Sequence, residues 1–426
     1  MPKRLVASLA VLGCLLGSGG AGAQTVSVTL QEVDGGPGYY ARFTNPLPTD
    51  PSFFPIGVWY ASVLSASEAA TDKAAGLNTY VELTGDTDLS VLRAAGMHAI
   101  DSGWPAGPGS ETNGWLLIDE PDGWAGPGWA AWTGNSPGQG PICDPPTAKC
   151  GYTVLSTLAA RRPADGRMRY TNFDYGVTFV ESDAEASLFV NGGFQDVVSA
   201  DNYWFSDKDI CTAEHGGAML GDGHALSTDE CRRAANYGAT VARLRKLGDE
   251  ARPVWAFVEV GHPYAEPSWP TITPPEMQAA VWHSLIAGAR GIIYFNHSFG
   301  APNVTPNVLR DPAYAGMRAA VTAVNARITA LAPVLNAPTV TSGWSDDSGV
   351  KTMVKWSGGH FYVFSGSAGS ATTSSFSLPC VGDATATVLD ENRTLPVAGG
   401  SFTDSFADGN AVHIYRIDGG TTCGLA

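Results

Sequence analysis

The chain has 426 residues, of which 44% are hydrophobic and 15% charged, an ordinary composition for a globular protein with a sizeable core. Its formal net charge of −16 comes from 41 acidic and 25 basic residues. So acidic a chain argues against nucleic acid or an anionic membrane surface as a partner. The length exceeds that of one small domain and suits a barrel of about 250 residues with an accessory domain.

Residues 1–23 have the pattern of a signal peptide, with Lys3 and Arg4 before the apolar run 5–16 and the small residues 21–23. Cleavage is expected after Ala23, which predicts a secreted or periplasmic protein. A lipoprotein site at Cys14 is the less favoured alternative, because the apolar run before it is short. No later apolar run approaches the ~20 residues of a membrane span.

Residues 24–52 contain two runs of alternating polar and apolar residues, 26–30 and 39–43, on either side of the Gly-rich stretch 35–38. This pattern predicts a β-hairpin. It would precede the next domain and either cap it or join the last domain of the chain.

From residue 53 to 333 an apolar strand, a loop and a helix follow one another repeatedly. Alternating strands and helices predict a parallel sheet, and eight strands are the number that closes a barrel. The expected fold is therefore α/β, a (β/α)8 TIM barrel over 53–333. The expected strands are 54–59, 77–83, 97–102, 115–120, 169–173, 197–203, 254–259 and 291–296, and the expected helices 67–75, 88–95, 154–160, 229–247, 275–289 and 313–331.

After residue 333 the helical pattern stops, and short alternating runs are separated by Gly, Ser, Asp and Asn. This pattern predicts a small antiparallel β-sandwich over 334–426. Two long connections within the barrel, 121–152 and 204–229, follow strands and would lie on the same face as the strand ends. The short runs of the expected sandwich are 339–344, 350–356, 360–365, 374–378, 385–389 and 411–417.

Six cysteines remain after the signal peptide, an even number that suggests disulfides in an exported protein. Pairing of neighbours is the simplest of the 15 possible connectivities, because each pair would close one local segment. The expected pairs are Cys143–Cys150, Cys211–Cys231 and Cys380–Cys423.

Carboxylates end two of the expected strands. The apolar run 115–118 is followed by Asp119, Glu120 and Pro121 at the end of strand four, and the run 254–258 by Glu259 at the end of strand seven. The carboxyl ends of barrel strands are where catalytic groups lie. Strands four and seven are nearly opposite, so Glu120 and Glu259 are expected to face each other. Two such groups about 5–5.5 Å apart would suit a retaining glycosidase.

These two strand ends resemble those of the large β/α-barrel clan A of retaining glycoside hydrolases. The segment 278–295 also resembles the last helix and strand of that clan, and a following β-sandwich is frequent there. The resemblance implies that Glu120 is the acid/base and Glu259 the nucleophile of a double displacement on a poly- or oligosaccharide. The clan most often has Asn before the acid/base, where this chain has Asp119, so the family is left open.

Further residues at strand ends or in adjacent loops are candidates for binding the carbohydrate, although each could instead be a structural group. The histidines lack the spacing of metal ligands, so neither a metal nor another cofactor is expected. The substrate-binding candidates are Trp59, Glu82, Asp101, Trp104, Asp119, Asp201, Asn202, Tyr203, Trp204, Tyr294 and Asn296.

Two other functions are compatible with the pattern. The first is a carbohydrate-binding barrel without catalysis, whose acids only accept hydrogen bonds from sugar hydroxyls. The second is a barrel hydrolase that uses a metal ion, whose activity a chelator would remove. The sugar, the linkage and the oligomeric state are left open by the sequence.

Overall fold

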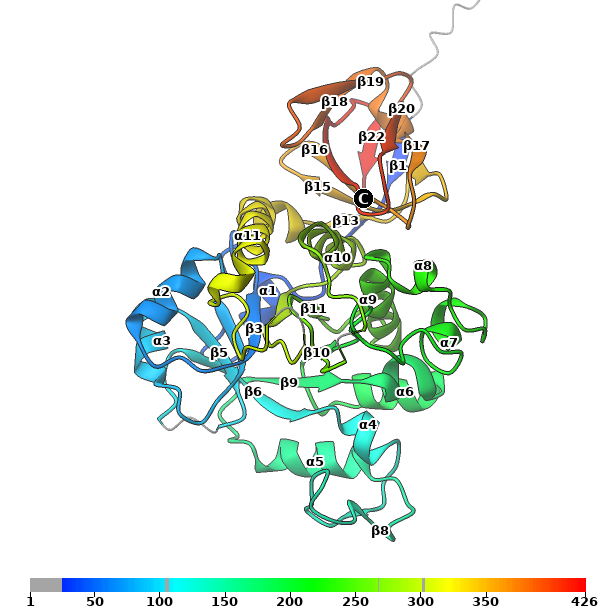
Figure 1. The fold of residues 1–426 in the computed structure, drawn as a ribbon. Coiled ribbons are helices and arrows are strands. Elements are labelled where there is room, and N and C mark those ends of the chain that lie inside the picture. Colours follow the sequence, from blue (N-terminus) through cyan, green and yellow to red (C-terminus); the bar gives the residue numbers. More distant parts are fainter. Residues whose placement is uncertain (1–24, 104–106, 267, 301–302) are drawn as a thin grey trace, which may run out of the picture.

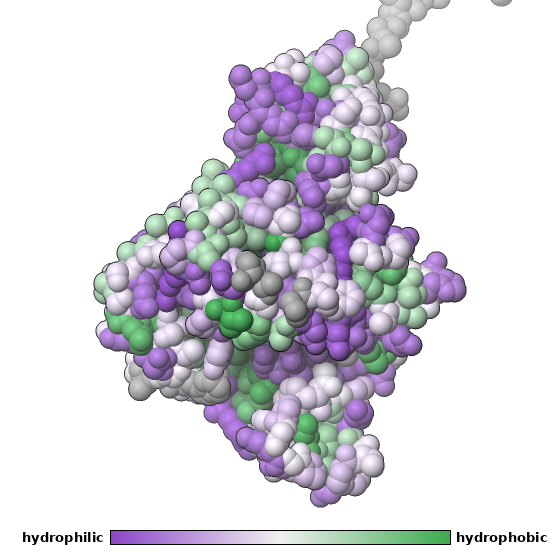
Figure 2. Space-filling view, in the orientation of Figure 1, coloured by the Kyte–Doolittle hydropathy of each residue, from purple (hydrophilic) through white to green (hydrophobic). Residues whose placement is uncertain are grey.

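The structure is a computed structural model that describes residues 25–103, 107–266, 268–300 and 303–426. The predicted signal peptide and Trp104 lie outside the described residues. A (β/α)8 barrel forms the larger body, and a β-sandwich stands on the helices α10 and α11 of the barrel (Figure 1). The sandwich and the connection around α5 and β8 extend from the barrel as two narrower lobes (Figure 2).

The described residues contain the eight predicted barrel strands, paired in parallel in the order in which they follow in the chain. A bridge between Val198 and Val254 joins the last two neighbours and closes the ring. The predicted fold is therefore confirmed, including the fifth and sixth expected strands, at 169–173 and 197–203. The strands are β3 (Ile56–Ala61), β4 (Thr79–Leu83), β5 (His98–Asp101), β6 (Thr112–Asp119), β9 (Met168–Phe173), β10 (Val197–Ala200), β11 (Ala256–Glu259) and β12 (Ile292–Phe295).

Helices surround the barrel where the 3.6-residue pattern predicted them, but α6, between the fifth and sixth barrel strands, was not predicted, and the last helix runs to Leu335, past the expected domain boundary at residue 333. The stretch 229–247 breaks into two helices, because Arg232 leaves the helical conformation after a capping box at Ser227. The helices of the barrel domain are α2 (Ala66–Ala74), α3 (Leu89–Ala95), α4 (Pro121–Ala125), α5 (Gly151–Arg161), the π-helical turn η1 (Gly176–Val180), α6 (Asp183–Asn191), α7 (Gly216–Leu220), α8 (Thr228–Cys231), α9 (Ala235–Leu247), α10 (Pro274–Ile286), the 3-10 turn η2 (Pro312–Tyr314) and α11 (Ala315–Leu335), with a short ribbon of β7 (Ala131–Trp132) and β8 (Cys143–Asp144) in the connection before α5.

The predicted N-terminal hairpin is wrong. The strands β1 (Val26–Val28) and β2 (Leu30–Gln31) pair with strands of the sandwich, whereas the second run contains the short helix α1 (Pro37–Tyr40). The alternating aromatic residues of that run close the N-terminal end of the barrel. Tyr40 packs in the barrel interior and accepts a hydrogen bond from Trp255 Nε1 at 3.0 Å.

The C-terminal domain is the predicted antiparallel β-sandwich, with its own apolar core. Trp282 of α10 packs against Phe364 of the sandwich at a ring distance of 6.2 Å, so the two bodies share a contact. The strands are β13 (Thr339–Val340), β14 (Ser345–Asp346), β15 (Val350–Ser357), β16 (His360–Ser367), β17 (Thr372–Ser377), β18 (Ala384–Val388), β19 (Arg393–Val397), β20 (Ser401–Phe406), β21 (Val412–Asp418) and β22 (Cys423–Leu425), with the 3-10 turn η3 (Pro379–Val381).

The three predicted disulfides are present in the described part of the chain. They join Cys143 to Cys150, Cys211 to Cys231 and Cys380 to Cys423. Disulfides of this kind indicate an oxidising compartment outside the cytoplasm. Among the described residues, no helix is both long and apolar enough to cross a membrane.

Candidate active site

The end of β6 is shaped to present two carboxylates. The pairing of β6 with β9 shifts register between Leu116 and Asp119, an irregularity that re-aims the side chains beyond it. Glu120 then adopts a left-handed backbone conformation, with φ 51° and ψ 40°, before Pro121 begins α4. A non-glycine residue in this conformation is strained by about 1–2 kcal/mol, and such strain concentrates at functional sites.

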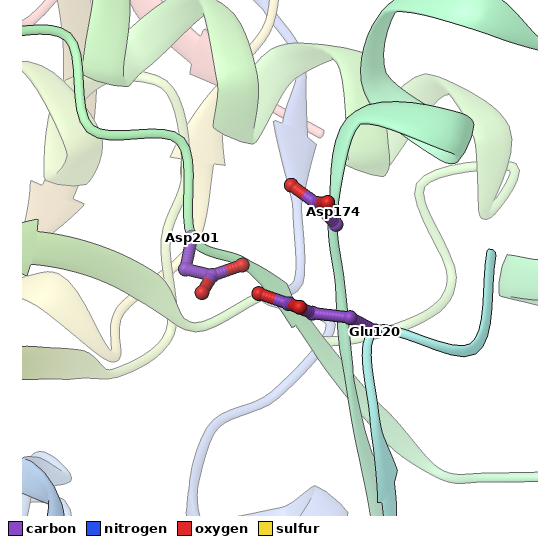
Figure 3. A group of neighbouring side chains, drawn as sticks. All are labelled: Glu120, Asp174 and Asp201. Atoms are coloured by element: carbon purple, nitrogen blue, oxygen red, sulfur yellow. The ribbon is translucent and has the colours of Figure 1, made fainter. Parts of the chain in front are cut away.

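Glu120 lies in a cluster with Asp174 and Asp201, which follow β9 and β10. Carboxylate oxygens of the three residues all lie within 4.8 Å of one another, a spacing that a shared proton, an ammonium group or a metal ion could bridge. The side chains of Glu120 and Asp201 point at each other, and Asp174 lies beside them (Figure 3). Sequence analysis missed Asp174, although it follows a predicted strand as directly as Glu120 does.

Hydrogen bonds from neighbouring strands hold this part of the site. Asn172 of β9 donates to Asp119 Oδ1 at 2.9 Å and accepts from Ser199 of β10, so three strands are tied together below the cluster. Asp122 is 2% exposed and accepts the backbone N–H groups of Asp174 and Val177, at 3.1 and 2.8 Å. The carboxylate of Asp122 therefore fixes the loop that carries Asp174 and is not itself part of the cluster.

Burial raises the pKa of each acid in the cluster. It brings the pKa values of Glu120 and Asp174 to about 7, with repulsion from Asp119 adding to the effect on Glu120. Asp201 is 8% exposed, and burial together with the negative charge of Glu120 raises its pKa well above the usual range. The hydrogen bond between the two favours the ionised form of Glu120 and the protonated form of Asp201. The pKa of Asp201 is therefore raised by the same contact that lowers the pKa of Glu120.

Glu259 does not face Glu120 across the mouth, contrary to the sequence expectation. Its side chain is 0% exposed, and its carboxylate accepts hydrogen bonds from the backbone N–H of Phe205 at 2.9 Å and from the hydroxyls of Ser206 and Tyr237. Tyr237 belongs to α9, so this carboxylate is directed into the wall between β10, β11 and α9. Burial raises the pKa of Glu259 to about 7.

Aromatic residues form an apolar layer in the barrel interior at the strand ends. Trp59 and Tyr203 are each 7% exposed and pack around Phe257, with ring distances of 5.3 and 6.4 Å. The hydroxyl of Tyr203 donates to Asp201 Oδ2 at 3.2 Å. Trp59, a predicted substrate-binding residue, is therefore mostly covered, whereas Tyr203 does contact an acid of the cluster.

Glu82 and Asp101 lie at the neighbouring ends of β4 and β5. Glu82 has φ 58° and accepts a hydrogen bond from Ser102 at 2.7 Å, and burial raises its pKa to about 7. Asp101 is 0% exposed and accepts the backbone N–H of Gly103 at 2.7 Å, and burial raises its pKa too. Glu82 remains a candidate for contacting a ligand, whereas Asp101 braces the strand end.

Four predicted binding residues belong to the barrel wall instead. Asn202 and Trp204 are 1% and 0% exposed and both bond Thr240 of α9. Tyr294 is 0% exposed and donates to Asn325 of α11 at 2.7 Å, and Asn296 is 2% exposed and holds the loop at residues 307–309. Successive side chains of a strand point to opposite faces, and this alternation continues through the strand ends. These four side chains therefore point away from the barrel axis or form hydrogen bonds with loops.

A cavity of about 750 Å³ lies elsewhere, between α9, α10 and β15. Its lining includes His283 and Lys351 and none of the three clustered acids. The cluster is therefore identified as a candidate site by its chemistry and not by this cavity.

No protein-family model and no curated protein sequence matches the chain. Several solved structures are similar to it. One described as a glycoside hydrolase has a TM-score of 0.50 at 12% identity, covering 94% of this chain and 98% of that one. A family 5 glycoside hydrolase from Bacteroides vulgatus has a TM-score of 0.48 at 10% identity, with 88% and 90% covered. The structure of α-galactosidase I from Mortierella vinacea has a TM-score of 0.48 at 11% identity, covering 88% of this chain and 99% of that one.

At these identities the comparison shows a shared fold. The protein has the (β/α)8-barrel fold found in glycoside hydrolases, with an accessory β-sandwich. Its distinguishing local feature is the group of three carboxylates at the carboxyl ends of β6, β9 and β10.

Proposed function

We propose that the protein is a secreted retaining glycoside hydrolase that cleaves a glycosidic bond in a poly- or oligosaccharide by double displacement, with Glu120 and Asp201 as its two carboxyl groups. The observation that carries the proposal is their opposition at the carboxyl end of the barrel, with oxygens within 4.8 Å. Inverting enzymes need about 6.5–9.5 Å between the two carboxyl groups to admit a water, whereas retaining enzymes use about 5–5.5 Å.

The proton distribution supports one assignment of roles. Asp201, whose pKa the contact with Glu120 raises, donates a proton to the leaving glycosidic oxygen, while Glu120, whose pKa the same contact lowers, attacks the anomeric carbon and forms a glycosyl-enzyme ester. Asp201, now ionised, takes a proton from water, and the resulting nucleophile displaces Glu120 from the sugar. This assignment differs from the resemblance to clan A, which implied that Glu120 is the acid/base and Glu259 the nucleophile.

The N-terminal sequence and the disulfides support export to the periplasm or the medium. Mass spectrometry of the mature protein is expected to find Gln24 as the first residue. A lipid-modified Cys14 would instead establish the lipoprotein alternative.

The test begins with purified protein on a panel of plant, fungal and bacterial glycans, with products identified by NMR. The first-formed product is expected to keep the anomeric configuration of the substrate. A 5-fluoro glycosyl fluoride of the accepted sugar should then trap the ester, and peptide mass spectrometry is expected to find the label on Glu120. A label on Glu259 would refute the proposed pair, and a label on Asp201 would reverse the roles.

Substitutions supply a second test. Glu120→Gln and Asp201→Asn are each expected to lower kcat by about 10³-fold or more, because each removes one chemical role while preserving shape. The activity of the wild type is expected to be the same with and without EDTA, because the proposed reaction uses no metal ion. Wild-type protein that binds glycans and never cleaves them would instead favour a carbohydrate-binding barrel.

A further inference from the structure

Acids greatly outnumber bases where the strands of the barrel end. Two guanidinium groups neighbour these acids, Arg162 beside Glu82 and Asp101, and Arg232 beside Asp207 and Glu259. Both are engaged by backbone carbonyls, Arg162 with Ser102 and Leu117 and Arg232 with Trp204 and Asp207. The acids at the strand ends or in the segments that follow them are Glu82, Asp101, Asp119, Glu120, Asp122, Asp174, Asp201, Asp207 and Glu259.

Neither base reaches the centre of the group. In the described part of the chain, the charges that shift the pKa values of Glu120 and Asp174 all belong to other acids. Glycoside hydrolysis by two carboxyl groups needs one proton donor and one nucleophile, which leaves Asp174 without a task in that reaction. The centre of the site therefore has more negative charge than the proposed chemistry uses.

One buried oxygen at this position also lacks a donor. Asp201 is 8% exposed, and its Oδ1 has no hydrogen-bond partner among the described residues. The side chain is directed into the cluster, toward Glu120 (Figure 3). Buried polar atoms without partners are rare in folded proteins, and each one calls for a ligand, a water or an ion.

We propose that the sugar bound at this site has a free amino group, and that Asp174 is the counter-ion of its ammonium. The inference rests on the proposed hydrolase and adds its substrate class, a glycan of unacetylated hexosamine units. An ammonium group has one positive charge and three N–H donors, so it can meet Asp174, the free oxygen of Asp201 and a further acceptor together. A sugar hydroxyl offers one donor and no charge.

The charge of the whole chain is consistent with such a substrate. A polymer of hexosamine with free amino groups is a polycation, and a protein with a formal net charge of −16 attracts it over a distance of about one Debye length. An N-acetylated or neutral glycan gains nothing from this attraction. The same argument predicts that raising the salt concentration weakens the apparent affinity for the amino glycan alone.

The experiment compares oligosaccharides of β-1,4-linked glucosamine with the N-acetylated oligosaccharides of equal length, and α-1,4-linked galactosamine oligomers with neutral galactose oligomers. At 50 mM salt, wild-type kcat/KM is expected to be at least tenfold higher for the free amine of the accepted pair. Asp174→Asn is expected to raise KM for the amine at least tenfold and to lower the ratio of kcat/KM for the amine to kcat/KM for the uncharged partner by a similar factor. Asp418→Asn, at an 83% exposed side chain of the sandwich, is the matched control.

Binding is measured separately by calorimetry with the Glu120→Gln protein, so that it does not depend on turnover. If the protein binds the amine oligomer but the wild type does not cleave it, the proposed hydrolase function is refuted and the proposed amine site is supported. Cleavage of neutral glycans only, with no KM change in Asp174→Asn, would overturn the amine site and leave the hydrolase standing. Calcium binding at the cluster with EDTA-sensitive activity would overturn it as well, since a metal ion would then be the cation.

Asp174→Asn is a suitable variant because the substitution should not disturb the fold. The side chain of Asp174 is partly buried. The hydrogen bond that holds this residue in place is donated by its backbone N–H to Asp122, and the substitution keeps that N–H. Circular dichroism and the melting temperature of the variant are expected to match the wild type. A folded variant with normal KM for the amine contradicts the proposal.

Discussion

Single charges around Glu120 should set the pH range in which the protein works. Glu120 must be ionised to attack, and burial together with the charge of Asp119 raises its pKa to about 7. Asp201 must keep its proton, and the same Asp119 charge helps to raise its pKa. Activity should therefore rise as pH increases through about 7 and fall again where Asp201 loses its proton.

Asp119→Asn is expected to move both limbs of this profile toward lower pH. The amide removes one negative charge from the neighbourhood of both carboxyl groups, so each loses its proton more easily, and its oxygen can still accept from Asn172. The measurement is kcat/KM against pH from 4 to 10 for the wild type and the variant. A profile that stays in place, or shifts to alkaline pH, would show that Asp119 does not act on the pair.

Glu259 should matter for stability more than for chemistry. Three donors converge on its buried carboxylate, from Phe205, Ser206 and Tyr237. Glu259→Ala leaves them without an acceptor, and we expect a loss of about 3–5 kcal/mol in the free energy of unfolding. Glu259→Gln keeps one oxygen and should cost about 1 kcal/mol. Urea titration measures both.

The activity of Glu259→Gln shows whether Glu259 has a structural role or is the nucleophile. Folded Glu259→Gln is expected to keep kcat within tenfold of the wild type, because the proposed reaction does not use this residue. A loss comparable to that of Glu120→Gln would mean that Glu259 swings out of the wall and serves as the nucleophile after all.

The sequence could place these acids at strand ends but could not say where they point. Glu120 and Glu259 end apolar runs of the same kind, yet the register shift in β6 turns one toward the axis, while Tyr237 and the loop after β10 capture the other. Both causes depend on residues far away in the chain. Asp174 was predictable in principle, since the rule that found Glu120 applies equally to the end of β9.

At the level of elements, burial explains which predictions succeeded. Strands covered on both faces are continuous apolar runs, so the eight barrel strands were recognisable from the sequence alone. The run at 39–43 alternates too, but its aromatic residues plug the barrel from a helical turn instead of forming a strand. Local alternation cannot distinguish these two cases, because the hydrogen-bond partners of Tyr39 and Tyr40 lie more than 100 positions away.

The segment between β2 and α1 places a buried carboxylate, Asp34, next to basic residues of the barrel. Its side chain is 6% exposed and forms ion pairs with Arg245 and with Arg290, the latter at 2.9 Å. Burial and the neighbouring Arg290 lower the pKa of Lys355, a fully buried residue of β15, and the charge of Asp34 opposes that shift. One carboxylate thus compensates several buried cations that come from both bodies.

Asp34→Asn is expected to lower the free energy of unfolding by about 3–5 kcal/mol, because it leaves the Arg290 guanidinium buried without a counter-charge. Thermal and urea unfolding measure the change, and Asp418→Asn serves as the exposed control with an expected effect below about 1 kcal/mol. Because Lys355 would lose the same counter-charge, the loss should be larger at pH 7 than at pH 10. A loss that does not depend on pH would show that Lys355 is already neutral.

For the whole molecule, the buried acids should make the protein most stable under mildly acidic conditions. Burial raises the pKa to about 7 for Asp119, Glu120, Asp122, Asp174 and Glu259. The folded state therefore holds more protons than the unfolded chain between about pH 4 and pH 7. Linkage then requires the free energy of unfolding to fall as pH rises through this window. Acids with lowered pKa values, such as Asp183 and Asp404, act in the opposite direction only at lower pH.

Glu181 offers a direct check of this behaviour, because it contributes to the pH dependence without belonging to the proposed reaction. It is 9% exposed, neither carboxylate oxygen has a partner among the described residues, and burial raises its pKa to about 8. The wild-type melting temperature is expected to fall by on the order of 10 °C between pH 5 and pH 8.5, since each unit of raised pKa corresponds to roughly 1.4 kcal/mol. Glu181→Gln removes one titrating group, so its melting temperature should exceed that of the wild type at pH 8.5 and converge with it at pH 5. Differential scanning calorimetry at the two pH values measures both trends, and a wild type that becomes more stable as pH rises would show that these carboxyl groups are ionised and compensated in the folded state.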